Sequence, residues 1–287
     1  MRALLVVNPA AGRRTARDGD LERCIAILTG AGIAFERVET GADGPHAAEL
    51  ARRAVAERFD ACIVAGGDGT VAPAAVQLLG SEVTLGILPF GSFMNIANGL
   101  RLPLAPVEAA RVIARKRVRS ADAGEVNGKV FFETAGVGLD AELIGSARHA
   151  ERGRWRRALR RIVRWATYET HRVKIAIGDE EHTHHAMQVL ILNSPYYGWS
   201  IEVLASASME DGLLDVAVFP RMGRLALLRA LFMAWRRQAL PGRPVFYRGA
   251  DIRVSSDDPI AVHADTVLAG GLPARFVCRK GALRVFG

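Results

Sequence analysis

The chain has 287 residues, of which 50% are hydrophobic and 24% charged, with a formal net charge of +8 and an isoelectric point near 10.0. This composition excludes a disordered protein and supplies enough apolar residues for two ordinary domains. Cys24, Cys62 and Cys278 show no CxxC spacing, so we expect neither a disulfide framework nor a structural zinc site, and a reducing cytoplasm is favoured. The basic balance favours an anionic partner: a nucleotide, nucleic acid or an acidic membrane surface.

The first 120 residues alternate β-branched runs with amphipathic helical patterns. This alternation predicts an α/β domain, with a parallel sheet covered by helices on both faces. Ligands of such sheets bind beyond the carboxyl ends of the strands, and we expect the loops there to share one edge. The expected strands are 3–8, 35–40, 61–66 and 83–89, the expected helices are 21–32 and 46–59, and the loops are 8–12, 40–44, 66–70 and 89–95.

The pattern changes after about residue 120. Short apolar runs separated by Gly, Pro and Asp turns predict an antiparallel β-sandwich or open barrel, interrupted by helical segments at 139–168 and 222–239. We therefore expect a nucleotide-binding α/β domain over 1–120 and a β-sandwich domain over 121–287, with the option that the last strand returns to the first domain. No apolar stretch reaches the roughly 18 residues that span a bilayer, and the N-terminal run is too short for a signal peptide. We expect a cytosolic protein, with a peripheral membrane role left open.

The sequence GGDGT at 66–70 follows a buried strand and has the features of a phosphate loop. Backbone N–H groups in a glycine turn beside a helix N-terminus can approach a phosphate closely, because no Cβ keeps it away. Asp68 could hold Mg²⁺ or its waters, and Thr70 could donate to a phosphate oxygen. A single glycine turn is common, but loops 8–14 and 88–100 carry similar anion-binding residues, and together they favour a nucleotide site. It is not a Walker A loop, since the chain has no GxxxxGK[ST].

These motifs carry a family resemblance. VNPAAG, GGDGT, LPFGS with a following NIA, and MEDGLLDVAVF occur in order between Ala3 and Phe286. The chain resembles the diacylglycerol kinase catalytic-domain family of lipid kinases, which includes bacterial diacylglycerol and phosphatidylglycerol kinases and the sphingosine and ceramide kinases. The resemblance implies an ATP- and Mg²⁺-dependent kinase that phosphorylates a hydroxyl of a membrane lipid. It also implies an active site in the cleft between a nucleotide-binding domain and a β-sandwich lipid-binding domain.

The resemblance also implies roles for individual residues. Asp68 and Asp122 would organise the catalytic Mg²⁺ and its waters. A structural metal would use the side chain of Asp211 and the main-chain carbonyls of Ser208 and Leu213, which are oxygen ligands of the kind Mg²⁺ prefers. The ATP contacts would fall on Asn8, Thr40, Gly66, Gly67, Asp68, Gly69, Thr70, Val71, Ala72 and Ser92.

The chain departs from the family pattern at two places that matter for catalysis. The family commonly has Asn-Glu where this chain has Ala72 and Pro73; proline is tolerated in the first turn of a helix, so the fold should survive. Near the C-terminus, Val267 replaces the acid that serves the family as general base. Valine cannot accept a proton, so we expect Asp265 to act as its surrogate, with Asp122 or another acid as the alternative. A general base contributes roughly 10²–10⁴-fold, so a missing base slows a kinase without abolishing it.

Several alternatives stay open at this stage. The arginine-rich segment 152–165 is either a core-facing helix with a basic outer face or an interfacial helix that binds anionic lipids. His182 to His185 are expected in a solvated hairpin turn rather than a metal site. Rival functions are a NAD kinase-like enzyme and a catalytically weak nucleotide- or lipid-binding family member. A nucleic-acid binder ranks last, because the arginines are not interleaved with stacking aromatics. The sequence distinguishes neither the acceptor lipid nor the oligomeric state.

Overall fold

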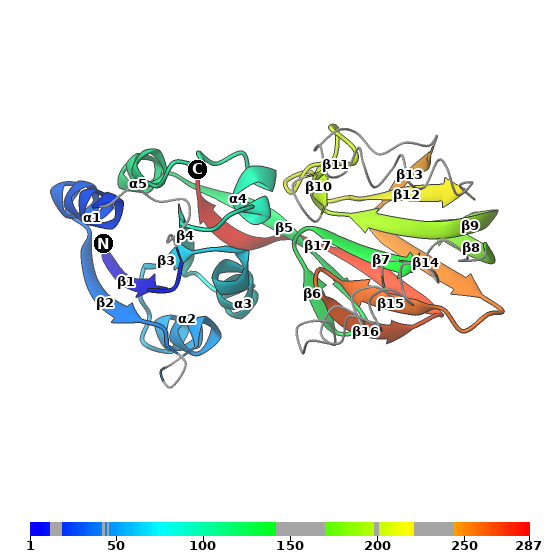
Figure 1. The fold of residues 1–287 in the computed structure, drawn as a ribbon, viewed down its shortest axis with the longest axis horizontal. Helices are drawn as coiled ribbons and strands as arrows, with labels where there is room; N and C mark the ends of the chain where they lie inside the picture. Colours follow the sequence, from blue (N-terminus) through cyan, green and yellow to red (C-terminus); the bar gives the residue numbers. More distant parts are fainter. Residues whose placement is uncertain are drawn as a thin grey trace, which may run out of the picture. The chain divides into compact units, whose positions relative to one another are not determined.

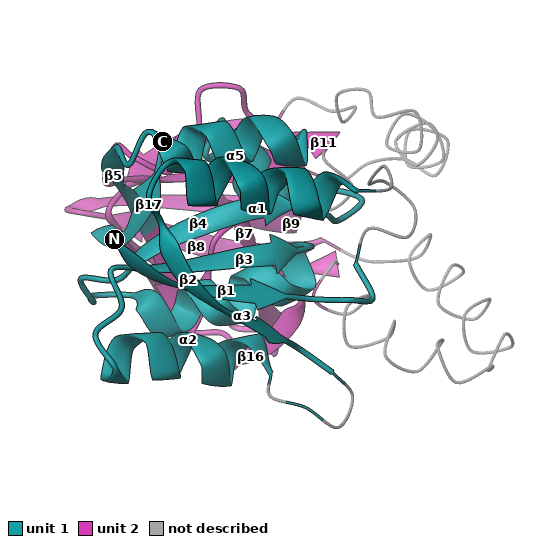
Figure 2. Cartoon of the chain, turned by 90° about the vertical axis from the view of Figure 1, so that its left-hand side faces the viewer, with its two compact units in different colours: residues 1–122, 280–287 teal, residues 123–279 magenta. Residues whose placement is uncertain are grey.

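The structure, a computed structural model, describes residues 1–11, 19–41, 44, 46–139, 141, 170–197, 201–220 and 244–287. The chain divides into two compact units (Figure 2). Unit 1 comprises Met1–Asp122 and Lys280–Gly287, and unit 2 comprises Ala123–Arg279. The predicted fold class is confirmed, because unit 1 is built on parallel strands with helices and unit 2 on antiparallel strands.

Unit 1 has a parallel sheet with the strand order β2-β1-β3-β4-β17. Helices α1 and α5 pack together on one face, and α2 and α3 pack together on the other (Figure 1). Its elements are β1 (Arg2–Val7), α1 (Asp20–Gly30), β2 (Ala34–Glu39), α2 (Ala47–Ala56), β3 (Ala61–Gly66), α3 (Asp68–Leu78), β4 (Thr84–Pro89), α4 (Asn95–Gly99) and α5 (Pro106–Ala114).

The strands of unit 1 follow the burial that this architecture imposes. Every residue of β3 and β4 is buried, which explains why both strands read as continuous runs of apolar or small residues. The outer strand β2 carries the alternating, largely exposed sequence AFERVE. The core contains Leu5, Ile63, Leu88 and Phe286, all at most 2% exposed. The three cysteines of the chain are free and buried, and burial raises the pKa of the Cys62 thiol to about 12.

Unit 2 is formed by antiparallel strands. β9 pairs with β8, β7 and β12, and β15 pairs with β7 and β16. Its strands are β6 (Lys129–Phe131), β7 (Thr134–Gly138), β8 (His171–Ile177), β9 (Glu180–Leu192), β10 (Tyr196–Tyr197), β11 (Ile201–Glu202), β12 (Leu214–Pro220), β13 (Val245–Gly249), β14 (Asp251–Ser256), β15 (Ala261–Ala264) and β16 (Val267–Gly271). Phe131 and Phe276 are fully buried in its core.

Two strands run through both units: β5 (Val118–Val126) begins in unit 1 and ends in unit 2, and β17 (Ala274–Phe286) does the reverse. The first half of β17 pairs with β14, and its second half pairs with β4 through Val285 and Leu85. The last residues of the chain are therefore part of the unit 1 sheet.

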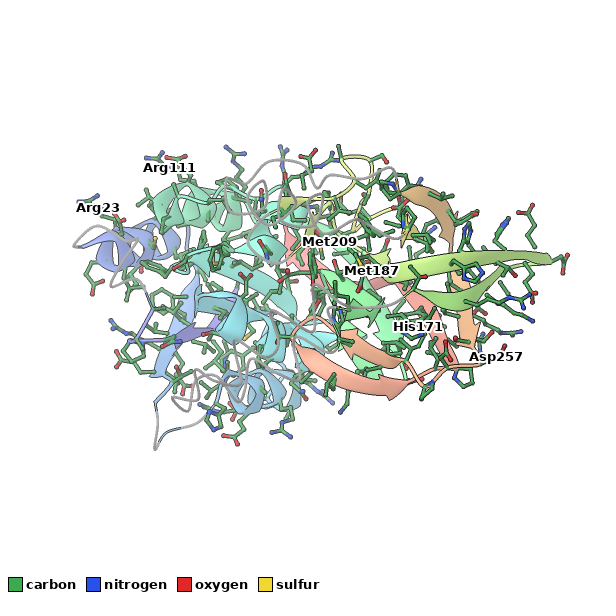
Figure 3. All side chains as sticks on the ribbon, turned by 45° about the vertical axis from the view of Figure 1, so that its right-hand side comes forward. Arg23, Arg111, His171, Met187, Met209 and Asp257 are labelled. Carbon is green, nitrogen blue, oxygen red and sulfur yellow. The ribbon has the colours of Figure 1, made fainter. Side chains whose placement is uncertain are left out.

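Side chains distribute as this core predicts. Figure 3 shows Arg23 and Arg111 at the outer sides of α1 and α5, where both are more than half exposed. Met187 and Met209 lie inside unit 2, at 4% and 1% exposure. Among the described residues, none of the helices combines the length and apolar character needed to cross a membrane.

Two of the predicted helical segments lie almost entirely outside the described residues, and a third prediction differs in part from the structure. The helical segment at 222–239 lies outside the described residues, and so does 139–168 apart from residues 139 and 141. The predicted hairpin is present, because β8 and β9 pair antiparallel around a turn at 178–179. The placement of His182 to His185 in its turn is wrong, because these residues lie in β9, opposite β8. The His182 ring stacks on Tyr247 of β13 at a centroid distance of 4.2 Å, and Nε2 of His184 lies 2.7 Å from the Tyr247 hydroxyl. No group of three or more metal-binding side chains occurs among the described residues.

Candidate active site

The loops singled out in the sequence lie at one edge of the unit 1 sheet, as predicted. The parallel register places Val7, the last residue of β1, beside Glu39 at the end of β2 and beside Ala65 near the end of β3. Gly66 is in turn beside Pro89 at the end of β4. Since parallel strands point the same way, the loops that begin at residues 8, 40, 67 and 90 emerge together.

The GGDGT loop opens helix α3. The helix begins at Asp68, with Gly67 as its N-cap in an extended conformation, and the N–H groups of Thr70 and Val71 both donate to the Gly67 carbonyl. A Cβ at Gly66 would lie 2.8 Å from the Thr70 Cβ, so this position requires glycine. The first turn of a helix presents backbone N–H groups and the positive end of the helix dipole. These are the features that bind phosphate.

Asn8 orients the threonine of this loop. Its Nδ2 donates to Thr70 Oγ1 at 2.8 Å, and its Oδ1 accepts from the Ala10 N–H at 3.0 Å. The main chain of Asn8 is tied to β3 by a 2.9 Å bond from its N–H to the Ala65 carbonyl. Because the Asn8 amide donates to the Thr70 oxygen, the Thr70 hydroxyl can donate its own hydrogen to another acceptor. Sequence patterns placed Asn8 and Thr70 at the same edge, and the structure brings them into contact.

Asp68 links the glycine loop to the next loop along the sheet. Its carboxylate accepts the N–H of Asn95 at 3.1 Å and the N–H of Ile96 at 3.2 Å, which caps the start of α4. Burial raises the pKa of the Asp68 carboxyl above its ordinary value, whereas the backbone N–H groups of Asn95, Ile96 and Met94 lower it. Asp68 therefore has a structural role that the sequence did not reveal.

The two glycine loops also touch directly through their backbones. A Cβ on Gly91 would lie 2.5 Å from the Gly67 Cα, and a Cβ on Gly67 would lie 3.2 Å from the Gly91 Cα. Only glycine at both positions lets the main chains approach this closely. Ser92, which follows Gly91, is exposed, and Thr40 is fixed by a 2.8 Å bond from its N–H to the Val7 carbonyl. Gly91 was not among the predicted site residues; its place one strand after GGDGT, in an LPFGS loop, was the available signal.

Pro73 is located differently from the sequence prediction. Since α3 starts at Asp68, inside the GGDGT motif, Pro73 is the sixth residue of the helix and lies beyond its first turn. A proline there has no N–H to donate to the carbonyl of Gly69, four residues earlier. The prediction placed the helix start too late, because the glycines looked like loop residues. The helix nevertheless continues to Leu78.

The two other aspartates assigned to catalysis have strong structural contacts. Asp122 is 1% exposed, and its Oδ1 accepts the Gly281 N–H at 2.6 Å. Asp265 accepts three backbone N–H groups, from Phe132 at 2.9 Å, Glu133 at 3.0 Å and Thr134 at 3.1 Å. Burial raises the pKa of the Asp265 carboxyl, while these donors and His263 lower it. Their catalytic roles stay predictions, and this geometry gives both residues a reason to be present without catalysis.

The Asp211 carboxylate of the predicted metal site has partners within the chain. The Asp211 Oδ2 accepts from the Arg248 guanidinium, and its Oδ1 accepts the Leu213 N–H at 3.0 Å. The Ser208 hydroxyl accepts the N–H of Glu210 at 3.3 Å. A guanidinium thus already neutralises the one carboxylate of the predicted ligand set, and the motif alone could not show Arg248. The metal role of Ser208, Asp211 and Leu213 stays a prediction, and Arg248 is a competing cation for Asp211.

A hollow in unit 1 does not coincide with these loops. It has a volume of about 570 Å³ and is lined in part by Asp60, Val83 and Thr84, at the amino ends of β3 and β4. The glycine loops lie at the opposite, carboxyl ends of the same strands. The candidate site therefore lies at the glycine loops and not in this hollow.

Comparisons with known proteins agree with this arrangement. The family described as "Diacylglycerol kinase catalytic domain" matches residues 2–126, and "YegS C-terminal NAD kinase beta sandwich-like domain" matches residues 134–287. A diacylglycerol kinase of Bacillus subtilis (strain 168) is 25% identical over 96% of this chain and 93% of its own length. One from Mycobacterium tuberculosis (strain CDC 1551 / Oshkosh) is 28% identical over 98% and 93%. The crystal structure of a diacylglycerol kinase from Bacillus anthracis str. Sterne has a TM-score of 0.76 at 23% identity, covers 99% of this chain and 96% of its own, and supports the fold alone.

Proposed function

Because the chain belongs to the family of diacylglycerol kinases and related lipid kinases, we propose that it is an ATP- and Mg²⁺-dependent lipid kinase. It transfers the γ-phosphate of ATP to a hydroxyl of a diacylglycerol-like membrane lipid and so serves phospholipid metabolism. The observation that carries this proposal is the contact of three loops at one sheet edge. Asn8 bonds Thr70, Asp68 caps α4, and Gly67 packs against Gly91.

These loops would hold the nucleotide. The backbone amides at the start of α3 and the Thr70 hydroxyl are suited to the phosphates, and Asn8 holds the Thr70 side chain in place. Phosphoryl transfer depends chiefly on positioning and on stabilising negative charge, so a rigid cradle of donors is the main requirement. The proposed ATP contacts are Asn8, Thr40, Gly66, Gly67, Asp68, Gly69, Thr70, Val71, Ala72 and Ser92.

Asp68 is the residue that we assign to the catalytic magnesium. Its carboxylate is partly exposed and offers the oxygen ligands that Mg²⁺ prefers. The ion, when bound with ATP, would neutralise charge on the phosphates. Asp122, almost entirely buried and bonded to Gly281, is a weaker candidate for this role.

The lipid substrate would be met at a membrane surface. The net charge of +8 favours attraction to anionic lipids. The segment predicted to mediate this contact, residues 152–165, lies outside the described residues. No nucleic-acid partner is proposed.

The decisive experiment measures transfer of labelled phosphate from ATP to lipid. Purified protein would be incubated with Mg²⁺ and mixed micelles of diacylglycerol, phosphatidylglycerol, ceramide or sphingosine, with NAD as a further acceptor. We expect one of the lipids to be phosphorylated, and Asp68→Ala to abolish that activity. The matched control is Asp60→Ala, which removes a carboxylate at the opposite end of β3 and should retain activity.

Two outcomes would overturn the proposal. Phosphorylation of NAD alone would identify a NAD kinase-like enzyme. Tight binding of ATP without transfer to any lipid would identify the catalytically weak binding protein that Val267 makes conceivable.

A further inference from the structure

Arg248 lies in a position to hold two aspartates at once. It is the fourth residue of β13, which pairs antiparallel with β12, and it lies directly opposite Asp215 in the register. Its Nε is 3.1 Å from the Asp215 Oδ1. The Asp215 side chain is only 8% exposed, so this charge has little access to water. An isolated carboxylate in such a place is costly unless a cation is paired with it.

The second carboxylate comes from the turn before β12. The Asp211 Oδ2 accepts from Nη2 of the same guanidinium, while its Oδ1 accepts the Leu213 N–H and so closes the turn. Arginine presents several N–H donors in one plane, which lets a single side chain bridge two carboxylates with different atoms. Arg248 therefore fastens the 208–213 turn to the sheet of unit 2.

The charges in this cluster depend on one another. Burial raises the pKa of the Asp215 carboxyl, the negative charge of Asp211 raises it further, and Arg248 lowers it. Two carboxylates that repel each other across one point need a cation between them. Here the cation is the Arg248 guanidinium. It pairs with Asp211, the residue for which the sequence resemblance predicted a divalent metal.

We propose that Arg248 replaces the structural metal ion, so that the 208–213 turn folds and stays folded without a divalent cation. Removal of the guanidinium should uncover a latent oxygen site, because Asp211 and Asp215 would be left facing each other, and paired carboxylates bind Mg²⁺ and Ca²⁺.

The test is thermal unfolding of the full-length protein without nucleotide, in EDTA, in Mg²⁺ and in Ca²⁺. We expect the wild-type midpoint to be the same in all three conditions. Arg248→Ala should lower the midpoint in EDTA by at least about 3 °C, and Mg²⁺ or Ca²⁺ should recover part of that loss. The double variant Arg248→Ala with Asp211→Asn should lose this recovery, since one of the two carboxylates is gone.

Two further variants keep the test decisive. Arg275→Ala removes an exposed arginine that pairs with Asp251 on β14, and it should lower the midpoint less and show no response to metal. Arg248→Gln removes the charge but keeps part of the side chain's bulk, and it replaces Arg248→Ala if the alanine variant fails to fold. A wild-type protein that loses stability in EDTA would overturn the proposal. So would an Arg248 variant that is as stable as wild type, or one whose loss neither cation recovers. The readout is independent of catalysis, so it stands whether or not the protein phosphorylates a lipid.

Discussion

Two aspartates, one in each unit, accept backbone N–H groups with both carboxylate oxygens. They differ in backbone conformation and in their position relative to the predicted phosphate loop. Asp265 has a φ of 48°, a left-handed conformation that aspartate tolerates better than most residues, and its two oxygens serve three donors. Asp68 lies in a helix, and its two oxygens accept the N–H groups of Asn95 and Ile96 at the start of α4, while the Met94 N–H also lowers the pKa of its carboxyl.

The question for each aspartate is whether its structural contacts account for its presence. The turn around Asp265 needs a carboxylate, so the fold alone accounts for the residue. The cap at α4 likewise uses both oxygens of Asp68, so the charge alone does not separate the two residues. Asp68 begins α3 within the GGDGT loop, where we propose that the phosphates bind, whereas Asp265 follows β15. Asp68 is therefore the stronger catalytic candidate, and the catalytic role of Asp265 stays a prediction.

The largest expected effect comes from removing the charge at Asp68 while its shape is kept. Asp68→Asn should lower kcat/KM by about 10²-fold or more, because charge stabilisation at the phosphates is lost. Its free energy of unfolding should fall by about 1–3 kcal/mol, since the amide NH₂ group would face one of the two N–H donors that the carboxylate accepts. Steady-state kinetics and urea unfolding measure the two quantities. Unchanged steady-state kinetics would show that the charge of Asp68 has no role in catalysis.

Asp265→Asn should lower stability by a similar amount but have a much smaller effect on catalysis. One donor of the three would face an amide NH₂ group, so the free energy of unfolding should fall by about 1–3 kcal/mol. Well below the unfolding temperature, kcat should fall by less than about tenfold, because no base has been removed. A loss of 10²-fold or more with intact stability would restore Asp265 as the general base.

The Asn8–Thr70 bond tests whether the phosphate cradle is preformed. Asn8→Ala and Thr70→Val should each raise the KM for ATP. The double variant should lower the free energy of unfolding by less than the sum of the two single variants. The coupling expected for one hydrogen bond is about 0.5–1.5 kcal/mol. Urea unfolding of the four proteins gives this value. Strict additivity would show that the bond does not orient the hydroxyl.

The smallest effect concerns pH. Burial raises the pKa of both aspartates in the folded state. A carboxyl whose folded pKa lies above its unfolded value of about 3.9 stabilises the protein most below that value, and this stability is lost as the pH rises through the folded pKa. Wild type should therefore gain stability relative to each Asn variant as the pH falls from neutral toward about 4. The opposite sign at either position would mean that the backbone donors outweigh burial there.

The sequence predicted the fold class and the shared edge of the loops because both depend on local patterns. Four apolar runs, each followed by a glycine or small-residue loop, are sufficient to predict parallel strands that point the same way. The start of α3 was missed, since GGDGT looked like a loop although the helix already begins at Asp68. That error of a few residues changed the meaning of Pro73.

What the sequence could not predict depends on pairing across long distances. Asp68 meets Asn95 after 27 residues, and Arg248 meets Asp211 after 37. Nothing near Arg248 marks it as a partner, because only the register of β12 and β13 places it opposite Asp215. Stacking of His182 on Tyr247 likewise requires β13, which no local pattern in β9 indicates.

The return of β17 to unit 1 has a consequence for biosynthesis. Val285 and Phe286 are at most 2% exposed, and Val285 pairs with Leu85 of β4. The ribosome translates all of unit 2 before these residues emerge. During that time the side of β4 that later pairs with β17 has no partner strand. Until then the partly made protein presents a strand edge to chaperones and to neighbouring nascent chains.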